Sequence, residues 1–153
     1  MKKHQSGFTL IEIMVTLTLL SILLSYGIPN LNDLLVRQSI STKVNDMQVD
    51  LAFARSEAIN GGTPVSIITD STWDQGWQIV TDTNRDGENE VLRVSDSASD
   101  KIVISDSSDT KKITFNPSGT YKSSEARELI FKHISIEDTK ILNIALSGNT
   151  NIN

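Results

Sequence analysis

The sequence predicts an α+β fold in which one long N-terminal helix packs on an antiparallel β-sheet domain. Two observations lead to this prediction. An apolar run over residues 8–28 passes into an amphipathic pattern over residues 29–60, which is typical of helix. Residues 61–153 hold short segments rich in isoleucine and valine between clusters of turn residues, which is typical of closely spaced strands. A short basic head, residues 1–7, precedes these parts.

The apolar run is long enough to form a transmembrane helix. Its 21 residues carry one charge, on Glu12. A helix of that length rises about 31 Å, close to the roughly 30 Å hydrocarbon core of a bilayer. The basic head, with Lys2 and Lys3, is expected to stay in the cytoplasm while the rest is translocated. A carboxylate in an apolar span is costly unless it is paired, so Glu12 is a candidate functional residue. A glutamate that faces the headgroups is the alternative.

The amphipathic part is expected to continue the same helix. Gly27 and Pro29 are predicted to kink or loosen the helix where the two patterns meet. Beyond them, apolar residues recur at spacings of three or four: Ile40, Val44, Met47, Leu51, Ala54 and Ala58. The charged residues between them, including Lys43 and Asp50, are expected on other faces. Gly61-Gly62 predicts the end of the helix. The apolar stripe needs a partner surface, which a sheet would supply.

Seven segments are predicted as strands, namely residues 64–68, 76–80, 90–94, 101–104, 112–115, 128–131 and 141–146. Most alternate apolar with polar residues, and the short turns between them favour antiparallel hairpins. Trp77 alternates with Ile79 and is expected in the core. For Trp73 the sequence does not decide between core and surface. A structural role is the default for His133.

Composition excludes several kinds of function. The net charge of −5 argues against non-specific binding to the phosphates of DNA. Without cysteine there is no disulfide framework, and with only two histidines a structural zinc site is not expected. The sequence holds no catalytic triad motif, P-loop or dinucleotide-binding fingerprint, so an enzyme is not expected.

The stretch Gly7-Phe8-Thr9-Leu10-Ile11-Glu12, placed between the basic head and the apolar run, resembles a type IV prepilin signal. The resemblance implies that residues 1–7 are a leader, that a prepilin peptidase cleaves after Gly7 and that the new N-terminal amine of Phe8 is methylated. It also implies that Glu12 serves subunit assembly by pairing with the Phe8 amine of a neighbouring subunit. Two alternatives remain: an ordinary signal peptide cleaved after the run near Ser25-Tyr26-Gly27, and a plain single-pass anchor.

A second resemblance covers nearly the whole chain. Five stretches are similar in order to minor pilins and pseudopilins of the FimT/GspH type: Leu51–Ile59, Pro64–Ile68, Gly76-Trp77, Val91-Leu92-Arg93 and Phe115–Gly119. The resemblance implies a type IV pilin-like fold and a non-catalytic minor subunit of a type II secretion pseudopilus or a type IV pilus. It places the chain in the bacterial inner membrane as a single-pass protein whose C-terminal domain is periplasmic, with other pilin or pseudopilin subunits as partners.

One loop has part of a calcium-binding pattern. Asp82, Asn84 and Asp86 match the first half of an EF-hand loop, with Gly87 at its turn. The pattern fails at the twelfth position, which is Arg93 rather than glutamate. A polar turn between strands is therefore favoured, calcium remains the alternative, and no other cofactor is expected.

The C-terminus bears on a DNA-binding alternative. Some pilin-like members of the family take up DNA through a Gly-Arg-x-Arg motif, and the corresponding stretch here is Gly148-Asn149-Thr150-Asn151. Asparagine stands in place of both arginines, so the stretch supplies no charge and releases no counterion. A minor pilin that binds DNA for natural transformation is the alternative function, but DNA is not expected as a partner through this stretch.

Overall fold

The computed structural model describes residues 8–84, 86–98, 101–108 and 110–153, and for residues 26–30 it describes the backbone alone. The predicted leader, residues 1–7 with Gly7, lies outside these ranges. The chain divides into two units, one up to Leu35 and one from Val36 to the C-terminus.

Helix α1 runs from Leu10 to Gly61 and matches the predicted helix within two residues at either end. It remains one helix across Gly27 and Pro29, so these residues do not break it. Gly62 then takes a positive φ of 64°, and its amide donates to the carbonyl of Ala58 over 3.1 Å. This left-handed glycine satisfies a carbonyl of the last turn and ends the helix, as predicted.

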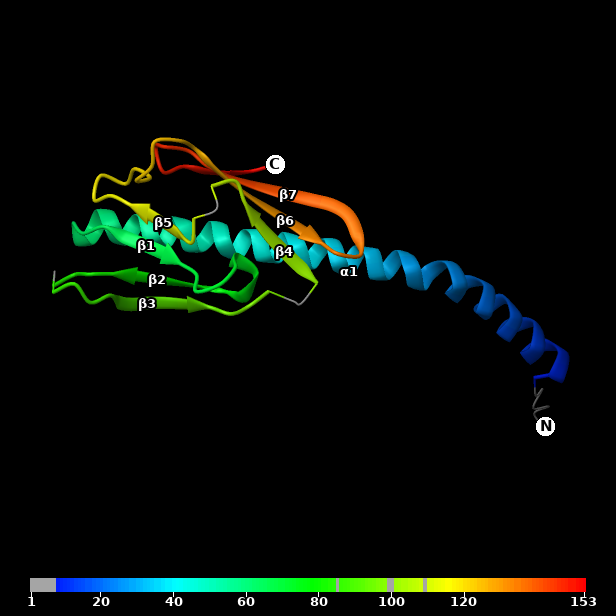
Figure 1. The fold of residues 1–153 in the computed structure, drawn as a ribbon. Coiled ribbons are helices and arrows are strands. Elements are labelled where there is room, and N and C mark those ends of the chain that lie inside the picture. Colours follow the sequence, from blue (N-terminus) through cyan, green and yellow to red (C-terminus); the bar gives the residue numbers. More distant parts are fainter. Residues whose placement is uncertain (1–7, 85, 99–100, 109) are drawn as a thin grey trace, which may run out of the picture. The chain divides into compact units, whose positions relative to one another are not determined.

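The strands form two antiparallel sheets of four strands each (Figure 1). The first has the order β3-β2-β1-β5 and is built from Glu90–Ser95, Trp77–Thr81, Val65–Ile68 and Lys112–Phe115. The second has the order β4-β6-β7-β8 and is built from Ile102–Asp106, Arg127–His133, Ile136–Ile144 and Thr150–Ile152. A short 3-10 helix, η1 (Trp73–Gln75), lies between β1 and β2.

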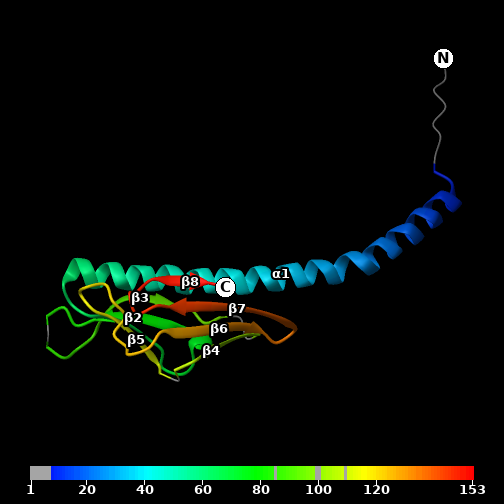
Figure 2. The ribbon, with the colours of Figure 1, turned by 90° about the horizontal axis from the view of Figure 1, so that it is seen from above.

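The core lies between the two sheets and the part of α1 that follows Leu35, and the sheets lie on one side of this part in Figure 2. All six stripe residues, Ile40 to Ala58, are at most 1% exposed. They pack with the inward side chains of both sheets, such as Ile67 and Phe115 of the first and Leu129 and Leu142 of the second. The prediction of a helix packed on antiparallel sheet is therefore confirmed, and the seven predicted segments all contain strands.

The structure differs from the predicted sheet in three respects. The strands make two sheets rather than one, β7 already begins at Ile136, and β8 was not expected. The sequence of β8, Thr150-Asn151-Ile152, is mostly polar, but its backbone completes the second sheet by pairing with β7. The hairpin of β6 and β7 is tied to the helix by an ion pair of 2.6 Å between Arg37 and Asp138.

Candidate functional site

The predicted assembly residue Glu12 lies in the first turn of α1, beside the residue that caps the helix. The amide of Glu12 donates to Thr9 Oγ1 over 3.3 Å, and the amide of Ile13 donates to the Thr9 carbonyl over 3.2 Å. Thr9 and Glu12 thus have the spacing of a capping box. A carboxylate in this position also interacts favourably with the positive end of the helix dipole. Glu12 and Phe8 are both exposed, so none of the residues that the structure describes covers either of them.

The helix segment that follows Glu12 is an uncovered apolar surface. Every residue from Phe8 to Ser25 is exposed, including ten leucine, isoleucine and valine side chains that are 47% or more accessible. The hydroxyls in the segment turn back to the helix: Thr16, Thr18, Ser21 and Ser25 each donate to a carbonyl three or four residues earlier, at 2.8–2.9 Å. Because these donors are satisfied inside the helix, the surface presents mainly hydrocarbon.

Among the residues that the structure describes, no helix is long and apolar enough to count as a membrane span. The transmembrane helix over residues 8–28 stays a prediction.

Two charged residues of α1 that were expected on faces other than the apolar stripe are buried. Lys43 is 8% and Asp50 is 5% exposed. Asp50 accepts hydrogen bonds from Trp77 Nε1 at 2.8 Å and from Arg93 at 2.7 Å. Lys43 Nζ donates to the carbonyl of Asp96 at 2.6 Å and lies 4.3 Å from the centre of the Trp77 ring. The expectation was wrong because partners from β2 and β3 compensate for the burial of these charges.

Burial lowers the pKa of Lys43, and the attraction of Asp46, Asp96 and Asp50 offsets this only in part. The ammonium group of Lys43 is held against an indole ring and a carbonyl. This cluster therefore fixes β2 and β3 on the helix rather than performing chemistry.

A buried ion pair within the second sheet also contacts the first sheet. Arg127 at the start of β6 is fully buried, and it donates to both carboxylate oxygens of Asp106 at the end of β4. Another Arg127 nitrogen donates to the carbonyl of Lys112 in β5 over 2.7 Å, and Trp73 Nε1 donates to Asp106 over 3.0 Å. Three elements, β4, β6 and η1, thus meet at one carboxylate, and Arg127 links them to β5.

Burial alone would raise the pKa of Asp106, but hydrogen bonds from Arg127, Ser108 and Trp73 and the charge of Arg127 outweigh it. The net effect is a pKa below the usual range of aspartate. The carboxylate stays ionised at neutral pH, and its oxygens are occupied by donors. It is a structural anion, not a general base.

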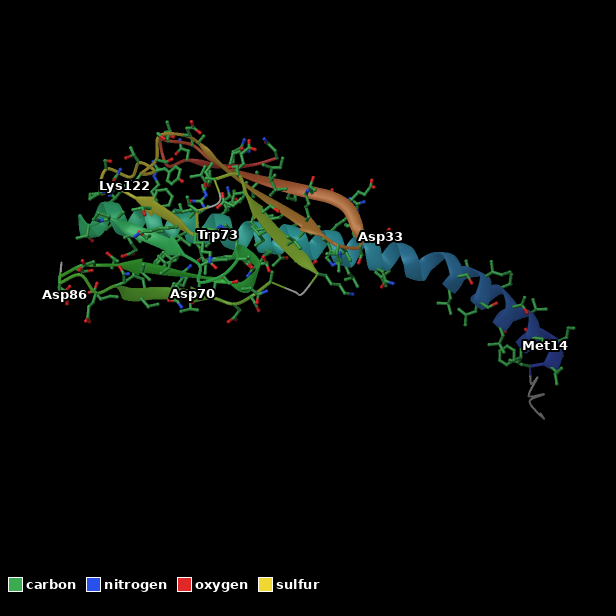
Figure 3. The ribbon with its side chains drawn as sticks, in the orientation of Figure 1. Met14, Asp33, Asp70, Trp73, Asp86 and Lys122 are labelled. Carbon is green, nitrogen blue, oxygen red and sulfur yellow. The ribbon has the colours of Figure 1, made fainter. Side chains whose placement is uncertain are left out.

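The remaining aromatic and histidine candidates are also structural. Trp77 is 2% exposed, which confirms its predicted place in the core, and Trp73, labelled in Figure 3, is 4% exposed. His133 is 7% exposed, and its Nδ1 accepts a hydrogen bond from the amide of Ser135 over 3.1 Å. The structural role expected of His133 fits this turn contact.

The loop of the calcium alternative is a polar turn whose side chains bind the loop's own backbone. The two oxygens of Asp82 accept from the amides of Asp86 and Gly87 at 3.1 and 3.2 Å. Asn84 Nδ2 donates to Asp86, so this amide presents a donor rather than an oxygen toward that carboxylate. Within the described part of the chain, no three histidine or carboxylate residues are grouped as metal ligands. The geometry favours the polar turn over calcium.

The C-terminal stretch of the DNA alternative is a turn that docks on the helix. Asn149 Oδ1 accepts a hydrogen bond from Arg55 of α1 over 2.8 Å. Thr150 and Asn151 belong to β8, where Asn151 pairs with Asn143. The positive charge beside this turn therefore belongs to Arg55 of α1. Arg55 binds Asn149, which occupies the position of the first arginine in the Gly-Arg-x-Arg motif.

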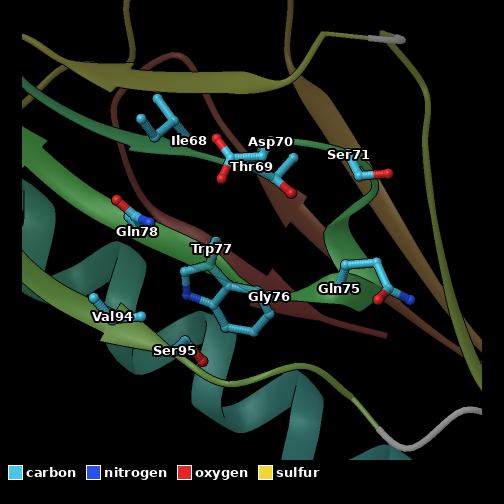
Figure 4. Close-up of a pocket in the computed structure, with 10 residues that line it drawn as sticks. All are labelled: Ile68, Thr69, Asp70, Ser71, Gln75, Gly76, Trp77, Gln78, Val94 and Ser95. Atoms are coloured by element: carbon cyan, nitrogen blue, oxygen red, sulfur yellow. The ribbon is translucent and has the colours of Figure 1, made fainter.

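The face of the first sheet that points away from α1 is hollowed. One hollow of about 270 Å³ is lined by Ile68, Gln78, Val94 and the loops on either side of η1 (Figure 4). A second, of about 540 Å³, is lined by Ser66, Val80 and Thr114 together with flanking loop residues. We call this surface of the first sheet the outer face.

Sequence reasoning missed Thr9, Arg55 and Arg127. Thr9 could have been found, because threonine followed three residues later by glutamate is the sequence signature of a capping box. Arg55 and Arg127 carry no such signal, since their partners lie 94 and 21 residues away along the chain.

Comparisons with known proteins agree with this architecture. The family model described as type II transport protein GspH matches residues 43–150, which is well over half of the chain. A model of the prokaryotic N-terminal methylation motif matches residues 2–27. Among curated proteins, none matches the chain significantly.

Solved structures share the fold. The type IV minor pilin FimU of Pseudomonas aeruginosa is 21% identical, with a TM-score of 0.67 over 76% of this chain and 90% of that chain. The minor pseudopilin EpsH from the type 2 secretion system of Vibrio cholerae is 10% identical, with a TM-score of 0.60 over 75% of this chain and 96% of that chain. At these identities the likeness establishes the type IV pilin-like fold.

Proposed function

The chain belongs to the GspH family of type II transport proteins and is a minor subunit of a type II secretion pseudopilus or a type IV pilus; we propose that it is anchored by its apolar segment and assembles through Glu12. The proposal extends to the maturation of the N-terminus, to the membrane and to the partners. In each respect the role is structural, in assembly rather than catalysis.

The proposed maturation is cleavage by a prepilin peptidase after Gly7, followed by methylation of the Phe8 amine. The methylation-motif match over residues 2–27 supports it. So does the geometry downstream, because Thr9 caps the helix and leaves Phe8 just ahead of its first turn. A chain that begins at Phe8 would keep this cap.

The proposed anchor is the segment from Phe8 to Ser25, inserted in the bacterial inner membrane with the sheet domain on the periplasmic side. The observation that carries the proposal is that this segment exposes hydrocarbon while its hydroxyls bond internally. Such a surface is unfavourable in water and needs lipid or neighbouring apolar helices to cover it. A filament whose subunits pack through these helices would supply that cover.

Glu12 is the proposed assembly residue, with the Phe8 amine of a neighbouring subunit as its partner. A carboxylate and an ammonium buried together relieve each other's loss of hydration. Glu12 finds no basic partner among the described residues of its own chain, so its charge is available for such a contact.

The proposal is tested on the full chain in cells that assemble the filament. Mass spectrometry of the membrane-extracted protein should show a mature chain that starts at methylated Phe8, and the protein should co-purify with sheared filaments. A mature chain that begins near Ile28, or one that retains Met1, would contradict the maturation. A correctly processed protein that never enters filaments would contradict the assembly role.

A further inference from the structure

The outer face of the first sheet is more apolar than a solvent-facing sheet surface normally is. Two cross-strand rows occupy it. One runs Lys112, Ile68, Gln78, Val94, and the other runs Thr114, Ser66, Val80, Val91. In an antiparallel sheet with one covered face, the other face usually carries polar side chains. Here the half formed by β2 and β3 carries three valines, of which Val91 and Val94 are exposed and Val80 is buried, with 2% of its surface accessible.

The exposed apolar side chains are concentrated on β3. Val91 and Val94 are 54% and 61% exposed, and Leu92 between them is 40% exposed. Val94 also lines the hollow of about 270 Å³, where Figure 4 shows it on the neighbouring strand to Gln78. A row of exposed aliphatic residues beside a hollow is a feature of surfaces that bind another protein.

Two features of edge strand β3 disfavour pairing with a further strand. A partner would therefore dock on the face of the sheet rather than extend it. A register shift opposite Ile79 and Val80 places a bulge in β3. Arg93 turns inward, where it pairs with Asp50 and stacks 4.1 Å from the centre of the Phe53 ring. Bulges and inward charges are the devices by which edge strands resist pairing.

The charge next to β3 is acidic. Asp70 lines the hollow beside Val94, Glu90 begins β3 and Asp96 follows its end. The other hollow is lined by Asp82 together with two lysines, Lys112 and Lys122, on the β5 side. The cation of this strand, Arg93, is occupied on the inner side by Asp50. A partner that covers the valines would therefore gain from lysine or arginine residues at the margin of its apolar contact.

We propose that the β3 half of the outer face is the docking surface for a neighbouring, non-identical subunit of the filament, which presents apolar side chains flanked by basic residues. The inference rests on the proposed function, since it takes its partner from the same filament. A second copy of this chain is the competing occupant, because Lys112 and Lys122 on the β5 side could receive its carboxylates.

The test uses the absence of native cysteine to place a single thiol. Val94→Cys is labelled with a maleimide-benzophenone reagent in membranes of cells that assemble the filament, and then irradiated. Val103→Cys is the matched control, because Val103 is also an exposed valine on an edge strand, 42% accessible on β4 of the other sheet. The probe on the Val94→Cys variant should form an adduct with a different subunit, identified by mass spectrometry, at least tenfold more strongly than the probe on the Val103→Cys variant.

An adduct with a second copy, equal labelling from both positions, or no adduct in assembled filaments would overturn the proposal. A charge substitution gives an independent readout. Val94→Lys should reduce recovery in sheared filaments at least tenfold, and Val103→Lys should stay within about twofold of wild type. Failure of the unmodified protein to enter filaments would instead count against the proposed function, so the two failures are distinguishable.

Discussion

The amide of Glu12 donates a hydrogen bond to the hydroxyl oxygen of Thr9 over 3.3 Å. The backbone amide of residue 12 therefore contributes to the cap of α1 independently of the side-chain charge. In a capping box, glutamine serves at the third helical position as glutamate does. Replacement of Glu12 by glutamine thus removes the charge and keeps the cap.

The first prediction is that Glu12→Gln leaves membrane insertion and leader cleavage intact but reduces incorporation into filaments at least tenfold. Loss of one partner of a buried ion pair typically costs about 3–5 kcal/mol, and 1.4 kcal/mol or so already changes an equilibrium tenfold. The measurement is co-purification with sheared filaments beside a membrane-fraction control. Thr9→Ala, which removes the capping oxygen and keeps the charge, is the matched variant. Normal incorporation of the glutamine variant would exclude the charge pair.

The second prediction concerns the core. Leu51 is fully buried in the stripe, so Leu51→Ala should lower the free energy of unfolding by about 2–5 kcal/mol. Val49 is 59% exposed on the same helix, and Val49→Ala should change it by no more than about 0.5 kcal/mol. Urea denaturation of residues 29–153 measures both. Equal effects of the two substitutions would mean that the stripe is not covered by the sheets.

The third prediction is a pH dependence that comes from Asp106. Because its pKa is lowered in the folded protein, ionised Asp106 stabilises the fold fully above the ordinary aspartate value of about 3.9. This contribution is lost as the pH falls through the lowered pKa. Asp106→Asn should cost about 3–5 kcal/mol at pH 7, because it leaves the buried Arg127 unpaired. The difference from wild type should shrink below about pH 4.

Denaturant midpoints of the wild type and the Asn variant at a series of pH values check this prediction. Asp70→Asn, at an exposed position, is the control and should follow the wild type throughout. The prediction is wrong if the difference in unfolding free energy between wild type and Asp106→Asn stays constant from pH 7 to pH 2. The contribution of Asp106 to stability would then not depend on its charge.

The fourth prediction concerns two turns that meet beside Arg55. Gly148 has a φ of +81°, and a methyl group there would come within 2.1 Å of the carbonyl oxygen of Gly119. Gly62 also has a positive φ, +64°, but has open space around it. Both alanine substitutions incur the left-handed backbone cost of about 1–2 kcal/mol. Gly148→Ala should destabilise more than Gly62→Ala in thermal unfolding, and equal losses would show that the two turns do not need this contact.

The sequence was sufficient for the parts of the fold that depend on local periodicity. The spacing from Ile40 to Ala58 identified the buried face of α1, and Gly61-Gly62 identified its end. The methylation motif around Phe8 could also be identified from the sequence, because it consists of consecutive residues. Cleavage after Gly7, methylation of Phe8 and the role of Glu12 remain predictions.

Features that depend on distant partners could not be read from the sequence. Lys43 and Asp50 border the stripe, three residues after Ile40 and Met47, and their burial depends on Trp77 and Arg93, which follow at least 27 residues later. The division into two sheets depends on which strands pair, and β8 exists because β7 offers it an edge. No local pattern specifies these choices.

The stripe on α1 also has a mechanical consequence. Its six side chains, from Ile40 to Ala58, are buried along five turns of one helix against both sheets. A pull along the helix axis would load all of these contacts at the same time, in shear. A pull across the axis would instead peel them apart one after another from an end. The domain should therefore resist tension along its own helix far better than tension across it.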